Sequence, residues 1–333
     1  MNNYTTTLIL DDKTIKKLVN IKQSIGCIER AFREYAQKKA QMPAKIYLDL
    51  KKYSGDFRAM PAYLGGLDSC MLKWVNVHAG NKRIGLPTVM AIIILSDPKT
   101  GFPLAIMDGT YATSLRTAAA GAVAAKYCAH KDSRIVGLVG CGAQAKAQLT
   151  ALRTLFKINE VRVWGHKPSI VKEFLSQMKM KKEMMISAKN IQECVRDCDI
   201  VVTTTPSRRP IVKFNWLKPG VHINAIGADA PGKQELDPGI LKSARIIIDH
   251  WEQASHSGEI NVPLKRKLIT KKDIYADIGE IVTGKKKGRV RKGEITVFDS
   301  TGLAIQDVAI ATLIYRMAIR NKKGRPIPII SKD

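Results

Sequence analysis

Small residues follow an apolar run near the middle of the chain, in the pattern Gly140-x-Gly142-x-x-Ala145. In a strand–turn–helix unit, the first glycine permits a tight turn and the second lets a diphosphate approach the backbone, while a small third residue lets the helix pack closely. The free N–H groups at the start of such a helix attract phosphate. Because an apolar strand pattern precedes this turn and a helix pattern follows it, we predict that Gly140 and Gly142 bind a dinucleotide.

The next predicted strand ends at Gly165-His166-Lys167, without an acidic residue. An acid at this position usually binds the ribose hydroxyls of NAD, and it would repel the 2′-phosphate of NADP. His166 and Lys167 would instead attract that phosphate. We therefore expect the cofactor to be NAD or NADP, with NADP accepted.

Hydroxyl and acidic side chains follow two later strand patterns. Thr204 and Thr205 come at the carboxyl end of one strand, where ligands lie in parallel sheets. Asp229 follows the other strand, in NAIGADAPGKQELD, where on its own it would be a turn residue. Glu235 and Asp237, at the end of the same segment, are predicted to be ordinary acids at the start of a helix.

The elements that must position these residues change in character at about residue 113. Before it, residues 14–40 fit an amphipathic helix or helix pair, and the alternation in LKWVNVH (72–78) predicts a strand. TVMAIIIL (88–95) and PLAIMD (103–108) flank turn residues and predict an antiparallel hairpin. Later, apolar strands alternate with helices, which predicts a parallel sheet covered on both faces. The fold class is therefore α/β, with a doubly wound parallel sheet of the Rossmann type beside an α+β region, to which an apolar last helix returns.

A series of blocks along the chain carries a family resemblance. In chain order they are GDFRAMPAYL, LKWVNVHAGN, GLPTVMA, DGTYATSLRTAAAG, VGLVGCGAQA, TTTPSRRP, HINAIGADAPGKQELD and FDSTGLAIQDVA. Together they resemble the ornithine cyclodeaminase/mu-crystallin family, and most of all its archaeal-type alanine dehydrogenase branch. The resemblance implies a homodimer, an α+β substrate-binding and dimerisation domain at residues 1–118 and 305–333, and an NAD(P)-binding Rossmann domain inserted into it at residues 119–304.

The resemblance also implies roles for charged residues. Lys73 resembles the active-site lysine that donates and accepts protons at the substrate, and burial or cationic neighbours lower the pKa of such a lysine. Arg58 and Arg116 match carboxylate-binding positions, because a guanidinium offers a planar two-pronged donor. Lys45 is a weaker candidate for the same anion. Asp229 is expected to orient the substrate nitrogen or an attacking water.

Cofactor contacts are implied in the same way. Arg116, which we expect at the start of an Ala-rich helix, can reach either the substrate carboxylate or the cofactor phosphates. The other residues that match cofactor contacts are Thr117, Ala143, Gln144, Ile226, Gly227, Ala228, Lys233, Ser300 and Gly302.

These matches imply hydride transfer at an α-carbon through an imine or iminium. We predict an NAD(P)-dependent alanine dehydrogenase, which interconverts L-alanine with pyruvate and ammonia. The GDFRAMPAYL block offers Arg58 and lacks the glutamate that cyclodeaminases carry there by the resemblance, and a cation would repel the distal amine of ornithine. A ketimine or pyrroline-2-carboxylate reductase and an ornithine cyclodeaminase remain alternatives. A non-enzymatic, mu-crystallin-like binding protein is disfavoured, because passive binding needs no proton relay at Lys73.

The composition bears on partners and location. The formal net charge is +26, with basic clusters at KMKKE (179–183), LKRK (264–267) and GKKKGRVRKG (284–293). Basic clusters bind nucleic-acid phosphates, but no nucleic-acid-binding motif accompanies these, so we expect no nucleic-acid partner. No apolar run approaches the roughly 20 residues that span a bilayer, and the N-terminal residues lack a signal-peptide pattern, so we expect a cytoplasmic protein. The six cysteines form no C-x-x-C pair, and we expect no metal.

Overall fold

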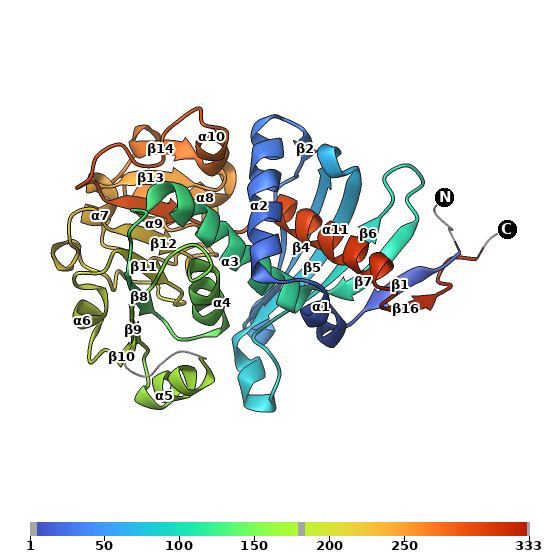
Figure 1. Ribbon diagram of the computed structural model, residues 1–333, viewed down its shortest axis with the longest axis horizontal. Coiled ribbons are helices and arrows are strands. Elements are labelled where there is room, and N and C mark those ends of the chain that lie inside the picture. The colour runs from blue at the N-terminus through green and yellow to red at the C-terminus, as the bar shows by residue number, and fades with distance from the viewer. Residues whose placement is uncertain (1–4, 179–183, 332–333) are drawn as a thin grey trace. The chain divides into compact units, whose positions relative to one another are not determined.

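The chain divides into two compact units in a computed structural model that describes residues 5–178 and 184–331 (Figure 1). Unit 1 comprises Met1–Arg116 and Leu303–Asp333, and unit 2 comprises Thr117–Gly302. The first boundary falls inside α3 (Gly109–Cys128). The basic cluster KMKKE (179–183) lies outside the described residues.

Unit 1 contains an eight-stranded sheet in the order β16-β1-β7-β6-β5-β4-β2, with β3 paired to β4. Its strand pairs are antiparallel except for the parallel pair β1–β7, and the predicted β6–β7 hairpin is confirmed. The strands are β1 (Thr7–Leu10), β2 (Ala40–Gln41), β3 (Ile46–Leu50), β4 (Gly55–Leu64), β5 (Ser69–His78), β6 (Val89–Ser96), β7 (Pro103–Asp108) and β16 (Arg325–Ile327).

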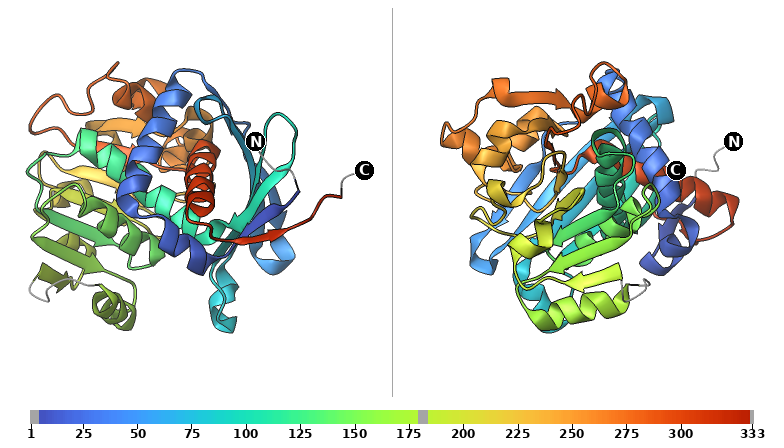
Figure 2. Two further views of the ribbon diagram at one scale, coloured as in Figure 1. Left: turned by 45° about the vertical axis from the view of Figure 1, so that its right-hand side comes forward. Right: turned by 60° about the vertical axis from the view of Figure 1, so that its left-hand side comes forward.

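Three helices pack on this sheet and on one another: α1 (Asp12–Leu18), α2 (Ile21–Ala36) and α11 (Ala304–Arg320). The first two form a helix pair, which is one of the two arrangements predicted for residues 14–40. Asn20 separates them and begins α2, because its side chain accepts from the Gln23 amide while the Gln23 side chain accepts from the Asn20 amide. Helix α11 lies along the middle of the sheet, over β4, β5 and β6 (Figures 1 and 2). The two ends of the chain therefore build one unit.

Unit 2 is an eight-stranded sheet in the order β10-β9-β8-β11-β12-β15-β13-β14, and all its pairs are parallel. Its strands are β8 (Ile135–Val139), β9 (Glu160–Trp164), β10 (Met185–Ser187), β11 (Ile200–Thr203), β12 (His222–Ala225), β13 (Arg245–Ile248), β14 (Ile274–Asp277) and β15 (Thr296–Asp299). After α3, its helices are α4 (Ala143–Leu152), α5 (Pro168–Gln177), α6 (Ile191–Val195), α7 (Pro238–Ser243), α8 (Trp251–Ser257), α9 (Asn261–Lys265) and α10 (Ile278–Val282). The Rossmann topology predicted from the alternating pattern is confirmed.

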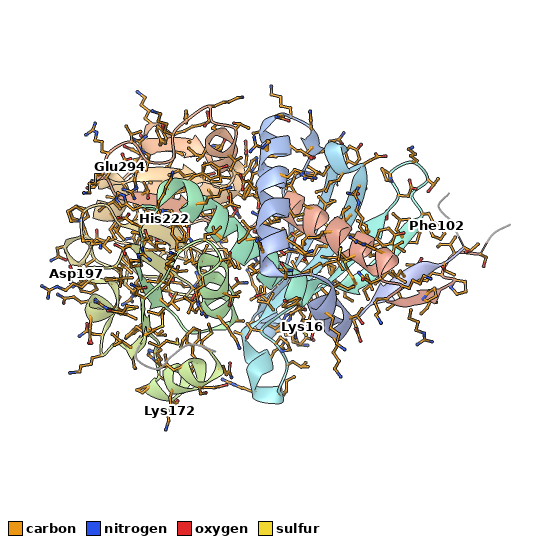
Figure 3. The ribbon with its side chains drawn as sticks, in the orientation of Figure 1. Lys16, Phe102, Lys172, Asp197, His222 and Glu294 are labelled. Atoms are coloured by element: carbon orange, nitrogen blue, oxygen red, sulfur yellow. The ribbon has the colours of Figure 1, made fainter. Side chains whose placement is uncertain are left out.

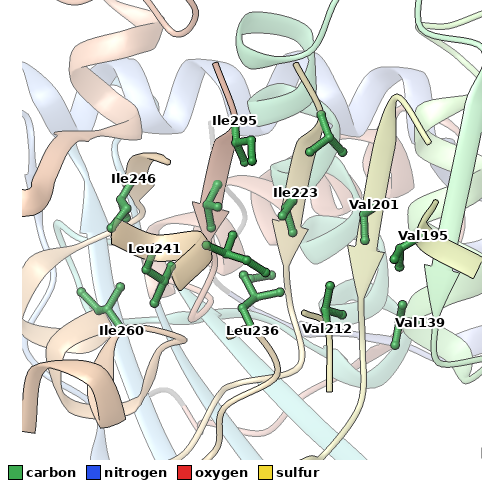
Figure 4. Close-up of a cluster of buried hydrophobic side chains, with 14 of the residues drawn as sticks. Val139, Val195, Val201, Val212, Ile223, Leu236, Leu241, Ile246, Ile260 and Ile295 are labelled. Carbon is green, nitrogen blue, oxygen red and sulfur yellow. The ribbon is translucent and has the colours of Figure 1, made fainter. Parts of the chain in front are cut away.

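The middle strands of unit 2 are buried on both faces: β11 is mainly apolar, and the polar side chains of His222, Asn224 and Thr296 in β12 and β15 are hydrogen-bonded to one another. On one face, Val201, Ile223 and Val297 from adjacent strands pack against Leu236 and Ile260 from the connecting segments (Figure 4). Such burial fixes the strand ends, and with them the loops that follow the strands.

Charged side chains lie on the outside of unit 2, together with exposed apolar ones such as Leu155 and Phe214. Lys172 and Asp197 are exposed, whereas His222 is fully buried within the sheet (Figure 3). Burial lowers the pKa of His222 to about 3, so this histidine is neutral and bonds Thr296 and Asn224. Among the described residues, no helix combines the length and the apolar character needed to cross a bilayer.

Candidate active site

Lys73 lies on the inner face of the unit 1 sheet, although its neighbours in β5 point outward. Strand alternation places it opposite Met60 of β4, and its side chain is fully buried with 0% of its surface exposed. Arg58 lies two residues before Met60 and therefore on the same face of β4. The register thus brings two of the predicted substrate-site residues onto one buried face.

Asp307, on the first turn of α11, completes this cluster. Lys73 Nζ donates to Asp307 Oδ2 at 2.6 Å, and Arg116 Nε donates to Asp307 Oδ1 at 3.0 Å. Arg116 also donates from Nη1 to Gln306 Oε1 at 2.9 Å. The sequence reasoning missed Asp307 and Gln306. The signal was present, because a single acid inside an otherwise strongly apolar helix needs a buried cation as its partner.

Burial lowers the pKa of Lys73 to about 7. Asp307 opposes this effect, while Arg116 and Lys45 add to it by repulsion. A lysine with this pKa exchanges a proton readily near neutral pH, which an ordinary surface lysine does not. Lys73 therefore has the electrostatic setting of a general acid or base.

The two predicted carboxylate-binding arginines have different surroundings. Arg58 forms a two-pronged ion pair with Asp56, with Nε–Oδ1 and Nη2–Oδ2 distances of 2.7 and 3.1 Å, and its guanidinium lies over the Tyr47 ring. The sequence placed Arg116 at the start of its helix, and this prediction was wrong. Helix α3 begins at Gly109, because the Asp108 side chain accepts from the Tyr111 amide and starts the helix earlier.

In unit 2, the turn after β8 has the features that a diphosphate requires. Gly140 has φ of +108°, which favours glycine, and a side chain there would meet Thr204. A Cβ atom added to Gly142 would meet nothing within 4 Å, and α4 begins there without a side-chain cap at Ala143. Gln144 Oε1 is buried and has no hydrogen-bond partner among the described residues. Open space, free helix N–H groups and an unpaired polar atom all fit a dinucleotide.

The residues predicted to meet the adenosine ribose lie at the end of β9. His166 and Lys167 are exposed, and Lys167 precedes α5. Gly165 is required by packing, because an added Cβ would collide with the Cys141 side chain. Residues 165–168, which directly follow β9, are Gly, His, Lys and Pro.

The remaining predicted cofactor residues of unit 2 lie where strands end. Thr204 and Thr205 follow β11; Ile226, Gly227 and Ala228 follow β12; Ser300 and Gly302 follow β15. Thr117 lies in α3, where its carbonyl accepts from Gln148. The buried Ser300 Oγ has no hydrogen-bond partner among the described residues. The groups that follow β11, β12 and β15 share the carboxyl edge of the parallel sheet, where ligands of this topology bind.

Asp229 and Lys233 form an ion pair with an Nζ–Oδ1 distance of 2.5 Å. The turn between them brings the predicted catalytic acid and a predicted cofactor residue together. Asp229 belongs to unit 2, whereas Lys73, Arg58 and Arg116 belong to unit 1. The predicted residues therefore form two groups, one in each unit.

Glu235 is not the ordinary helix-start acid that the sequence suggested. It is fully buried, and burial raises the pKa of its carboxyl above the usual range. Asp237 does begin α7, where its side chain accepts from the Gly239 amide. Glu259 and Asp299 are also fully buried acids, and neither was singled out from the sequence. Within residues 5–178 and 184–331, no three His, Cys, Asp or Glu side chains lie close enough together to hold a metal ion.

The sequence profile of the ornithine cyclodeaminase/mu-crystallin family matches residues 5–322. The chain belongs to this family. An alanine dehydrogenase from Archaeoglobus fulgidus is 52% identical over 321 residues, or 96% of this chain and 98% of the relative.

Solved structures of this family agree with the fold. An archaeal alanine dehydrogenase dimer with bound NAD has a TM-score of 0.93 and 51% identity, covering 98% of this chain and 100% of that chain. A Δ1-pyrroline-2-carboxylate reductase from Thermococcus litoralis, solved with NADH and L-proline, has a TM-score of 0.93 and 36% identity, covering 96% and 100%.

Replacing Asp307 by Asn should lower the pKa of Lys73 below about 7, because the carboxylate is the group that stabilises the ammonium. The pKa is measured from the ¹³Cε chemical shift of Lys73, identified by its loss in Lys73→Met. Asp97→Asn, which alters a buried acid in the β6–β7 turn, is the matched control and should leave the titration in place. A Lys73 titration that stays near pH 7 in Asp307→Asn would contradict the assignment.

Proposed function

We propose that the protein is an NAD(H)-dependent alanine dehydrogenase. The reaction is L-alanine + NAD⁺ + H₂O → pyruvate + NH₄⁺ + NADH + H⁺, and it is reversible. The observation that carries the proposal is the buried Lys73, whose pKa burial lowers to about 7 against the opposing effect of the Asp307 carboxylate. The 52% identity to the alanine dehydrogenase of A. fulgidus supports the substrate.

Unit 1 supplies substrate binding and proton transfer in this proposal. Arg58 and Arg116 bind the substrate carboxylate, and Lys45 adds positive charge near it. After the substrate ammonium has given up a proton to solvent, the Cα–H bond breaks with its electron pair leaving as hydride, and water then attacks the iminium carbon. Neutral Lys73 accepts the proton of that water and returns it to the departing ammonia. Burial keeps Lys73 neutral for a larger fraction of the time at pH 7 than an exposed lysine.

Unit 2 supplies the cofactor site. Gly140, Gly142 and the start of α4 bind the diphosphate, and the loops after β11, β12 and β15 bind the nicotinamide half. When bound there, the nicotinamide would supply the hydride acceptor for deamination or the hydride donor for the reverse reaction. The exposed His166 and Lys167, with no acid beside them, support acceptance of NADPH as well as NADH.

Asp229 is assigned to the substrate nitrogen or to the attacking water. Its carboxylate would balance the positive charge that develops on the iminium nitrogen, and its ion pair with Lys233 orients it. This role rests on the family match.

Pyruvate with ammonia should consume NADH faster than Δ1-pyrroline-2-carboxylate does. Ornithine should release no ammonia under conditions in which NADH is neither formed nor consumed overall. NADH absorbance and ammonia release are measured, and NADPH is run in parallel to test cofactor acceptance. Faster reduction of the cyclic imine would make the protein a pyrroline-2-carboxylate reductase. Turnover of ornithine would make it a cyclodeaminase.

Lys73→Ala should lower kcat by about 10²-fold or more, because general acid–base catalysis usually contributes that much. NADH affinity, measured by fluorescence titration, should stay unchanged, since Lys73 belongs to unit 1. Lys172→Ala, at an exposed lysine of unit 2, is the control and should keep full activity. An active Lys73→Ala variant would end the proton-transfer role.

We propose further that the chain forms a homodimer through the outer face of the unit 1 sheet. The strand register aligns Ile46, Ala59, Trp74 and Ile92 in one row across β3, β4, β5 and β6, with Leu72 and Ile94 beside them. All except Ala59 are exposed, Trp74 by 43% and Ile92 by 53%. A contiguous apolar face of this kind marks a protein interface. The related archaeal alanine dehydrogenase is a dimer.

A cytoplasmic location stays a prediction.

The wild-type protein should have a mass in solution of twice the 36.8 kDa of one chain. A variant with both Trp74→Glu and Ile92→Glu should be a monomer, because two buried carboxylates would oppose association. Light scattering after size-exclusion chromatography measures the mass. Leu155→Glu, at another exposed apolar residue, should leave the dimer intact. A dimeric double variant would place the interface elsewhere.

A further inference from the structure

The Glu235 carboxylate joins two loops of unit 2 that follow different strands. Its Oε1 accepts from the backbone amide of Thr205 at 2.6 Å and from the Thr205 hydroxyl at 2.7 Å. Its Oε2 accepts from the backbone amide of Gly227 at 3.0 Å. One side chain therefore fixes the loop after β11 and the loop after β12 relative to each other.

The backbone of Glu235 is itself fixed on both sides. Its amide and the amide of Leu236 donate to the buried carboxylate of Glu259, at distances between 2.6 and 3.0 Å. Its carbonyl accepts from the amides of Ile211 and Val212 at 2.8 and 3.0 Å. The core of unit 2 thus holds Glu235 in place, and Glu235 in turn holds two loops at the ligand-binding edge of the sheet.

The strand order indicates which half of a dinucleotide these two loops meet. The adenosine half lies over the end of β9, and the diphosphate lies at the turn after β8. In the sheet, β11 and β12 lie on the other side of β8 from β9. The nicotinamide half must therefore extend over the ends of β11 and β12.

We propose that Glu235 is a positioning residue for the nicotinamide half of the cofactor. It sets the spacing of the loops at Thr205 and Gly227 and makes no contact with the cofactor itself. The spacing is close, because a Cβ atom added to Gly227 would collide with the Thr205 carbonyl and with the Glu235 carboxylate. This inference rests on the proposed cofactor function and adds a residue that acts through its neighbours.

A carboxylate suits this role better than an amide, and the donors that it binds oppose the rise in pKa that burial causes. Both of its oxygens accept, and all three of its partners in the two loops are donors. A glutamine would present an NH₂ group to one of the loops, so that two donors would face each other and one loop would shift.

Glu235→Gln should raise the Kd for NADH by about tenfold or more, which corresponds to about 1.4 kcal/mol. The Kd for ADP, which carries the adenosine and diphosphate but no nicotinamide, should stay unchanged. Both are measured by isothermal titration calorimetry. Asp237→Asn, two residues along, is the matched control, because asparagine begins a helix as well as aspartate does and both Kd values should be unaltered.

A merely structural role for Glu235 would weaken NADH and ADP binding together, and that result would overturn the proposal, as would unchanged NADH binding. If Glu235→Gln does not fold, Glu235→Asp, which keeps the charge and shortens the reach, should show the same selective loss. Wild-type protein that binds neither nucleotide would overturn the cofactor proposal itself and the positioning role with it. Wild-type binding of both, without turnover of pyruvate and ammonia, would overturn only the substrate assignment.

Discussion

The ion pair between Lys73 and Asp307 joins the two ends of the chain inside unit 1. Lys73 lies on β5 and Asp307 lies on α11, 234 positions later in the sequence. A buried ammonium is very costly without a partner, and removing one member of a buried pair typically costs about 3–5 kcal/mol. The C-terminal helix must therefore dock on the sheet before Lys73 can be buried there. Docking and the lowered pKa of Lys73 are two results of the same packing.

Buried carboxylates organise unit 2 in a comparable way. Glu235 holds the loops after β11 and β12, and Glu259 holds the backbone of Glu235. After β15, Asp249 accepts from the Thr301 and Gly302 amides, next to the predicted cofactor residue Ser300. A loop cannot satisfy its own N–H groups as a strand does, so buried acceptors give these loops fixed shapes. Rigid loops reduce the ordering cost of binding a cofactor.

The sequence predicted most of the architecture because periodicity reports burial. Strands such as β8 and β11 are almost entirely apolar, and Lys73 stands out in an alternating strand. Asp307, Glu235 and Glu259 were missed because their importance comes from contacts between distant segments. In a sequence, an acid that begins a helix cannot be told from a buried acid that binds two loops at the ligand-binding edge of a sheet. The early start of α3 was missed because its cap, Asp108, is also the last residue of a strand.

The most direct test of the account is the pH dependence of kcat/KM for deamination of L-alanine, measured in the wild type and in Asp307→Asn. Only neutral Lys73 can accept a proton, so the wild-type value should rise with pH and level off above about pH 7. Without the carboxylate, which raises the pKa of Lys73, the inflection should move to lower pH. An inflection at the same pH in both proteins, or no inflection near pH 7 in the wild type, would contradict the assignment of Lys73 as the proton-transferring group.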